Sequence, residues 1–159
     1  MSKSRTSATF SNISRAGTPW VAGAITIASG ASDYMATTNF GFVIPLNAKI
    51  IGVMATYALS LNNSNALNDV TKLVIAGALA GNNNGMGVGP LAPGNQFGSA
   101  KDKWGLALTP AIVNADNFGI AVGVNGGPSV ITVTGVTLVV SFIDSNHIQH
   151  SKSRHLARF

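Results

Sequence analysis

Two long segments of the chain alternate between apolar and small or polar residues with a period of two, the pattern of a β-strand. In residues 49–61 one face holds Ile51, Val53, Ala55, Tyr57, Leu59 and Leu61. In residues 129–144 one face holds Val130, Thr132, Thr134, Val136, Leu138, Val140 and Phe142. Both segments exceed the usual strand length of about 5–6 residues and are rich in β-branched residues. Their opposite faces are small or semi-polar, which predicts a sandwich whose second face is partly covered by neighbouring segments.

Shorter strand candidates lie between turns rich in Pro, Asn and Gly. These candidates are residues 20–28, 39–45, 70–80, 103–108 and 118–124. One short helix is expected after Thr109, because this residue can cap a helix that begins with Pro110. Strands at such spacing without alternating helices predict an all-β fold, an antiparallel β-sandwich or jelly roll with at most one short helix.

The tripeptide Asn-Phe-Gly occurs twice, at residues 39–41 and 117–119, each time before an apolar run. We expect each Phe to close one end of the core and each Asn to hydrogen-bond the local backbone. Each Gly is expected to leave room for another backbone or ring on the opposite face of the strand. The repeat is therefore interpreted as a device of the fold that carries no chemistry.

Charge divides the chain into three parts. Only 9% of the residues are charged, against about 25% in a typical soluble domain. Residues 1–15 and residues 145–159 each carry three basic residues and no acid, whereas the middle holds four lysines and five aspartates. We therefore predict an N-terminal basic arm over residues 1–18, a β-sandwich domain over residues 19–144, and a C-terminal basic arm over residues 145–159.

The arms and one long loop are the candidate partner-binding segments. Residues 81–100 are rich in Gly, Asn and Pro, and a structureless loop of this length is unusual inside a domain. It is interpreted either as a mobile tip or as an arm ordered by a partner. The predicted contact residues are Arg5, Phe10, Arg15, Met86, Leu91, Phe97, Lys152, Arg154, Leu156, Arg158 and Phe159.

The sequence offers little for catalysis. Glu and Cys are absent, and the aspartates lie in separate predicted loops, so the carboxylate pair of a glycosidase is not expected. His147, His150 and His155 lie beyond the last predicted strand, where no framework would hold a catalytic base or a zinc ion. The Gly-rich loop lacks a phosphate-binding signature. We expect no enzyme activity, no cofactor and no metal. Without an apolar run of about 18 residues, no membrane-spanning segment is expected.

Several pieces of the sequence occur in a recognisable order between residues 19 and 143. They are Trp20, the Asp33–Ala36 turn, the run 39–53, Trp104-Gly105, Thr109-Pro110-Ala111 with Asn114, Phe118-Gly119, and the Val-rich strand 130–143. In this order they resemble a β-domain of structural proteins of tailed bacteriophages and prophages. The resemblance implies a place in the virion, as a head decoration, cement, fibre or tail accessory protein. Relatives often carry acidic and aromatic residues in the long strands where this chain has Ala, Thr and Ser, so the role stays open.

The favoured hypothesis is a non-enzymatic structural component of a tailed-phage virion, assembled in the host cytoplasm. As a capsid decoration or cement protein it would stabilise the shell through its arms and multivalent contacts, as a homo-oligomer bound to other virion proteins and above all to the major capsid protein. The alternative is a tail or head-fibre module with a carbohydrate- or receptor-binding face that uses Trp20, Tyr34, Tyr57 or Trp104. Three formal charges in each arm are few for binding nucleic acid.

Overall fold

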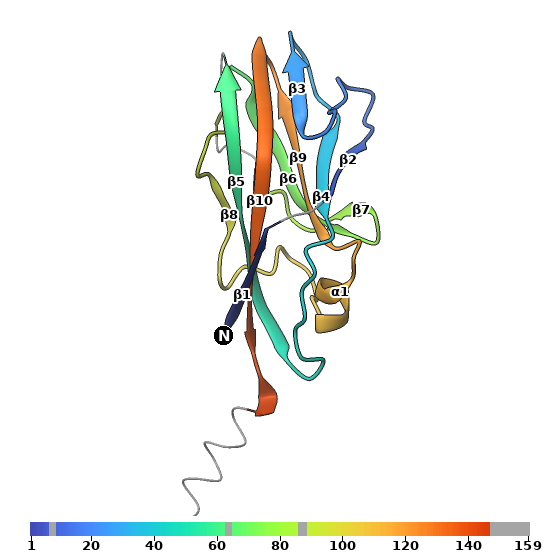
Figure 1. Cartoon of the computed structure of the whole chain (residues 1–159), viewed down its shortest axis with the longest axis vertical. Helices are drawn as coiled ribbons and strands as arrows, with labels where there is room; N and C mark the ends of the chain where they lie inside the picture. Colours follow the sequence, from blue (N-terminus) through green and yellow to red (C-terminus); the bar gives the residue numbers. More distant parts are fainter. Residues whose placement is uncertain (7–8, 63–64, 86–88, 147–159) are drawn as a thin grey trace, which may run out of the picture.

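Two antiparallel sheets pack face to face in the computed structural model, which describes residues 1–6, 9–62, 65–85 and 89–146 (Figure 1). Sheet A has the order β1-β10-β5-β8, with β3 also paired to β10, and sheet B has the order β2-β4-β9-β6-β7. The elements are β1 Ser2–Thr6, β2 Thr9–Ile13, β3 Ala24–Ile27, β4 Tyr34–Thr38, β5 Lys49–Asn62, β6 Leu67–Ile75, β7 Ala78–Ala80, β8 Gln96–Gly98, α1 Pro110–Asn114, β9 Gly119–Asn125 and β10 Ser129–Ile143. The predicted all-β sandwich with one short helix is confirmed.

The long strands β5 and β10 pair along nearly their whole length, and two bulges change which residues face the core. Thr134 is the extra residue between the pairs Val133↔Leu59 and Gly135↔Ala58. Because a bulge shifts the alternation by one residue, the core-facing side chains change phase there. The buried residues of β10 that point inward are Ile131, Val133, Val136, Leu138, Val140 and Phe142. The face that the sequence pattern groups from Val130 to Phe142 therefore points into the core after the bulge and outward before it.

A second bulge lies near the start of β5. Ile51 is left out between the pairs Ser141↔Gly52 and Phe142↔Ile50. The predicted face of β5 is confirmed from Val53 to Leu59, which are buried at alternate positions. At the bulge, however, the buried residue is Ile50, and Ile51 is only half-buried.

The first Asn-Phe-Gly tripeptide is hydrogen-bonded to the residue that precedes the second. Phe40 and Phe118 are both buried in the core, as predicted. Asn39 N donates to the carbonyl oxygen of Asp116 at 2.8 Å, which ties the first tripeptide to the loop before the second. Gly119 lies tightly against β4, since a Cβ there would be 1.8 Å from Thr37 O.

The first glycine of the pair has a different role from the one expected. A Cβ on Gly41 would meet nothing within 4 Å, so no backbone or ring approaches it. Its φ of +64° lies in the left-handed region that glycine adopts most readily. Residues 39–48 do not form the predicted strand; they cross from β4 in sheet B to β5 in sheet A.

The N-terminal segment expected as an arm belongs to the sandwich instead. β1 pairs with β10 from Ser2↔Ser141 to Thr6↔Thr137, and β2 pairs with β4. The pairing satisfies backbone groups along β10 that would otherwise form an open edge. At the other end of the chain, Ser145 and Asn146 follow β10, and the remainder of the predicted C-terminal arm lies outside the described residues.

Two further strand predictions differ from the structure, and the prediction of where the helix begins is confirmed. Residues 70–80 divide into β6 and β7, which turn at Ala76 and Gly77 with φ values of +53° and +80°. Residues 103–108 form turns instead of a strand. The short helix α1 begins as predicted: Thr109 is its N-cap, and the Thr109 side chain accepts a hydrogen bond from Ile112 N at 3.3 Å.

Candidate interaction surfaces

Arg5, a predicted partner contact, binds the chain's own backbone. It pairs with Leu138, a core residue of β10, so its side chain leaves β1 on the inner side of the sheet. Arg5 Nε donates to Gly41 O at 3.3 Å, and Lys3 Nζ donates to Val43 O. These two basic side chains therefore bridge the open side of the sandwich between β1 and the crossing segment 39–48.

Arg15 is likewise engaged within the domain. Its Nη1 and Nη2 each donate to an Asp69 carboxylate oxygen at 2.9 Å, a bidentate pair, and Nη2 also reaches Val124 O at 3.2 Å. The guanidinium carbon lies 4.6 Å from the ring centroid of Tyr34. Burial opposes the charge of Arg15, but the hydrogen bond and charge of Asp69 outweigh it and raise the pKa of Arg15. The residue thus joins the loop after β2 to the start of β6.

Asp33 organises the loop between β2 and β3. Its carboxylate accepts hydrogen bonds from Asn12 Nδ2, Arg15 N and Gly17 N, each at 2.9 Å. These bonds, that of Asn12 most strongly, lower the pKa of Asp33. Its backbone oxygen accepts the indole N–H of Trp20 at 3.0 Å. The turn at Asp33 therefore has a structural role. Both of its carboxylate oxygens accept hydrogen bonds from the protein itself.

Two apolar residues of the loop 81–100 complete the core, in contrast to the prediction that they reach a partner. Leu91 and Phe97 are each 1% exposed. Phe97 lies in β8 opposite Ala55, and its ring meets that of Tyr57 edge-on with centroids 5.7 Å apart. Burial against their own sheet leaves these two side chains no surface for another molecule.

The remaining predicted contacts divide between a half-buried residue and the undescribed segments. Phe10 on β2 is half-buried and packs against the core. The predicted contacts that lie outside the described residues are Met86, Lys152, Arg154, Leu156, Arg158 and Phe159.

The aromatic residues considered for a glycan site do not offer an open ring face. Trp20, Tyr57 and Trp104 are buried in the core. Tyr34 is half-buried and lies under the Arg15 guanidinium. A sugar that stacks on an aromatic ring needs that ring exposed, so none of these four residues can supply such a platform.

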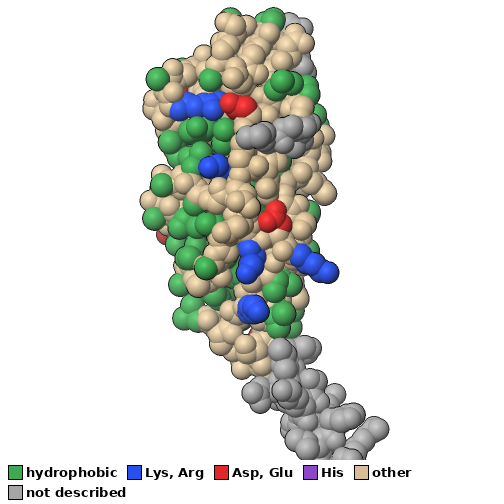
Figure 2. All heavy atoms as spheres, turned by 180° about the vertical axis from the view of Figure 1, so that it is seen from behind, with side chains coloured by type: hydrophobic (Ala, Val, Ile, Leu, Met, Phe, Trp, Pro, Cys, Tyr) green, Lys and Arg blue, Asp and Glu red, His purple; other side chains and the backbone are tan. Residues whose placement is uncertain are grey.

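The outer face of sheet A carries no charged strand residue between the pair Val130↔Asn62 and the pair Ser141↔Gly52, and this stretch is called the uncharged face. Lys49, which pairs with Ile143, lies just beyond it at the end where β5 begins. Pairing places Thr6, Thr137 and Thr56 in one row across β1, β10 and β5, and Gln96 of β8 continues the row. The other described residues of these strands and β3 that share the uncharged face are Ser2, Ser4, Ala24, Thr26, Gly52, Met54, Ala58, Ser60, Asn62, Val130, Thr132, Thr134, Gly135, Val139, Ser141 and Gly98. Figure 2 shows the opposite side of the molecule, where basic and acidic side chains lie among neutral and hydrophobic ones.

Exposed apolar side chains lie toward both ends of the long strands. Val21 and Val130 lie toward the end where β10 begins, next to β3. Val43, Leu46 and Ile143 lie toward the end where β10 finishes and β5 begins. Each end thus presents apolar surface that a neighbouring protein could bury.

Groups that could perform chemistry are not gathered in the described part of the chain. Across residues 1–6, 9–62, 65–85 and 89–146 no set of three or more His, Cys, Asp or Glu side chains is placed to hold a metal ion. Within the same ranges, no helix has the length and apolarity needed to cross a membrane.

Comparisons of the chain with protein-family models, with curated proteins and with solved structures gave no match. The assignment of function therefore depends on the surfaces described above.

Sequence reasoning missed the uncharged face although a signal for it was present. Thr and Ser recur at alternate positions in residues 2–6, 54–60 and 132–141, but the pairing that brings them onto one face is tertiary. Two small pockets on either side of Val21 had no comparable signal in the sequence, because their walls come from β2, the turn before β3, β3, β4 and β10.

Proposed function

We propose that this chain is a non-enzymatic structural component of a tailed-phage virion, and specifically a decoration or cement protein of the capsid. The observation that carries the proposal is the uncharged face of sheet A, which extends from Val130 to Ser141 along β10 and ends before Lys49. Such a face can be covered by another protein without the cost of removing charges from water. It suits a subunit that works inside an assembly.

The dimensions of this face fit a protein–protein contact. From Val130 to Ser141 the uncharged face follows β10, which at about 3.3 Å per residue spans roughly 40 Å. The strands on its two sides, at about 4.8 Å spacing, make the face roughly 15–19 Å wide. The resulting area of roughly 600–750 Å² lies within the range of about 600–1,000 Å² for one partner in an interface of standard size. The loop around Ala100 crosses this face at Gly52, which leaves most of its length open.

The resemblance to phage structural proteins supports the same proposal. Its recognisable residues serve the fold: Trp20 and Asp33 close a loop, Trp104 Nε1 donates to Val53 O at 2.9 Å, and the two Phe side chains close the core. The pattern thus describes a scaffold, and the surfaces outside the pattern determine the partner. Many copies on one shell would add their contacts, so that each contact could be weak.

The proposal is tested with shells of the phage that encodes this chain, prepared without it. The wild-type protein should bind such shells and raise their melting temperature. Thr137→Lys puts a charge in the centre of the uncharged face and should abolish both effects. Ala111→Lys, on the exposed side of α1, is the matched control and should retain them. Failure of the wild type to bind, or equal binding by Thr137→Lys, would overturn the proposal.

A further inference from the structure

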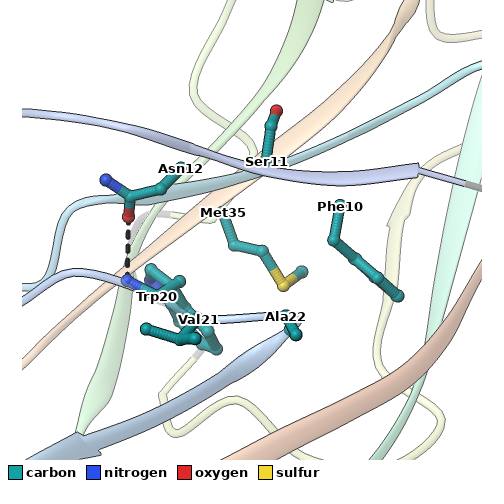
Figure 3. A pocket seen from close by; sticks show the side chains of 8 residues that line it. Phe10, Ser11, Asn12, Trp20, Val21, Ala22 and Met35 are labelled. Atoms are coloured by element: carbon teal, nitrogen blue, oxygen red, sulfur yellow. Dashed lines mark hydrogen bonds between the residues drawn. The ribbon is translucent and has the colours of Figure 1, made fainter.

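Two small neighbouring pockets share Val21, in the segment between β2 and β3, as a lining residue. The first has a volume of about 230 Å³ and is lined by Phe10, Ser11, Asn12, Trp20, Val21, Ala22, Gly23 and Met35 (Figure 3). The second has a volume of about 280 Å³ and is lined by Pro19, Val21, Ala24, Ile25, Thr26 and Val130. Val21 is a wall of both pockets, and its side chain is 71% exposed.

The chemistry of the walls selects an apolar occupant. No charged side chain lines either pocket. Asn12 Oδ1 accepts the backbone N–H of Trp20 at 2.8 Å, and its amide nitrogen is bound to Asp33. Figure 3 shows the Ser11 hydroxyl pointing away from Met35 and Phe10. Whatever enters the first pocket therefore meets mainly carbon and sulfur.

The size of the pockets narrows the occupant further. Sites for a whole small molecule usually measure about 300–1,000 Å³. Each of these pockets is smaller, and Val21 separates them. They suit two separate side chains of a peptide better than one ligand.

We propose that this pair of pockets binds the C-terminal segment of a second copy of the chain, with Leu156 and Phe159 as the two anchors. The chain continues from His147 to Phe159 beyond the described residues. In its last eight residues, Leu156 and Phe159 are the large apolar side chains, separated by two residues. The inference rests on the proposed function, because it supplies the contact between neighbouring subunits.

The position of the two ends favours a second copy over the same copy. The pockets lie beside Val130, near the start of β10, whereas the C-terminal segment leaves from the end of β10, at the opposite end of the domain (Figure 1). Ser145 Oγ donates to Asn47 O at 2.8 Å, which holds the chain at that end. The strand between Val133 and Ile143 alone spans roughly 33 Å.

A return within one copy would require an almost straight chain. The residues from Ser145 to Leu156 reach at most roughly 36–40 Å when fully extended. That reach exceeds by only a few ångströms the roughly 33 Å of strand to be retraced. A second copy placed end to end presents its pockets near the departing segment. Such a contact joins different surfaces of the two copies. Repeated contacts of this kind form either a closed ring or an open linear chain of subunits.

The test measures self-association of the full-length chain without any shell. Sedimentation velocity of the wild type should show association that increases with concentration. Leu156→Asp with Phe159→Asp should abolish it, and Val21→Asp should do the same. Ala78→Asp is the matched control, because Ala78 is exposed on β7, the edge strand of sheet B, away from both ends of the molecule (Figure 1), and it should associate like the wild type. Circular dichroism should show that each variant is folded; Val130→Asp replaces Val21→Asp if that variant unfolds.

A second measurement identifies the site directly. A labelled peptide with the sequence of residues 145–159 is titrated into the full-length Leu156→Asp, Phe159→Asp variant, whose own tail cannot compete. Adding Val21→Asp should weaken peptide binding by about ten- to a hundredfold, the range for one lost apolar anchor.

Two results would overturn the inference. One is peptide binding that Val21→Asp and Val130→Asp leave unchanged. The other is a wild type that stays monomeric at all concentrations. If the peptide then binds only after the tail residues are changed, the tail occupies the pockets of its own domain, which also overturns the inference. Since no shell is used, failure here leaves the shell-binding result of Thr137→Lys intact, and the two proposals can fail separately.

Discussion

The two glycines of the repeated tripeptide should differ sharply in their tolerance of a methyl group. In Gly119→Ala the new Cβ would be 1.8 Å from Thr37 O, and real Cβ atoms essentially never come closer than 3.0 Å. β9 and β4 would have to separate by more than 1 Å, where Gly119 pairs with Thr38. Overpacking costs about 1–3 kcal/mol, and each weakened ladder hydrogen bond adds about 0.5–1.5 kcal/mol. We expect Gly119→Ala to lower the free energy of unfolding by about 3 kcal/mol.

Gly41→Ala is the matched control in the other copy of the tripeptide. Its Cβ would meet nothing within 4 Å, and only the positive φ of +64° opposes the change. A left-handed non-glycine residue costs about 1–2 kcal/mol. The structure already holds Ala22 and Ala76 at φ values of +50° and +53°. We therefore expect Gly41→Ala to cost about 1 kcal/mol.

Urea unfolding followed by circular dichroism separates the two variants. With a slope of about 2 kcal/mol per molar urea, the midpoint should fall by about 1.5 M for Gly119→Ala and by about 0.5 M for Gly41→Ala. Equal shifts, or a larger shift for Gly41→Ala, would refute the reasoning that one glycine serves packing and the other serves the backbone angle.

Three further predictions concern a buried hydroxyl, a carboxylate and an edge strand. Among the described residues the Tyr57 hydroxyl is buried without a hydrogen-bond partner, so Tyr57→Phe should raise the free energy of unfolding by about 1 kcal/mol in urea unfolding, and a loss would contradict this. The pKa of Asp33 is lowered in the folded state, so the stability that its carboxylate contributes is present above the unfolded pKa of about 3.9 and is lost as pH falls through the lower folded value. Between about pH 7 and pH 2 the melting temperature of Asp33→Asn should therefore fall less steeply than that of the wild type. Parallel curves for the two proteins would exclude this role. Deletion of residues 2–6 uncovers the edge of β10, so light scattering should show aggregation that the intact chain lacks; a deletion variant that stays monomeric would show that the edge needs no cover.

The alternation of side chains was enough to predict the long strands, and the turn signals indicated antiparallel pairing. Neither pattern predicted the bulges. Thr134 and its neighbours Thr132 and Thr137 fit either face of a sheet, so nothing in the sequence marks where the phase changes. The phase changes because Val133, Thr134 and Gly135 of β10 lie opposite only two residues of β5, Leu59 and Ala58. That pairing is set by the tertiary structure.

The N-terminal strands escaped prediction because they are stabilised differently from the core strands. Residues 2–6 contain no apolar side chain, and β1 is attached through backbone pairing to β10 and through Arg5 to the crossing segment. Conversely, the Gly-rich composition of the loop 81–100 obscured the burial of Leu91 and Phe97. Composition indicated where chain is exposed on average, and these single side chains depart from the average because they fill the core.

The candidate surfaces were predictable only in part. Low overall charge was visible in the sequence and led to the hypothesis of an assembly subunit. The location of the uncharged face depends on the register that aligns Thr6, Thr137 and Thr56, and only the structure supplies that register.

The most direct test of a structural role in the capsid is the number of copies of this chain in purified virions, measured against the shell subunit by quantitative mass spectrometry. A decoration or cement protein should be present at a copy number that is a simple fraction or multiple of the shell subunit. A few copies per particle would place the chain at the tail or portal, and its absence from the particle would contradict the account.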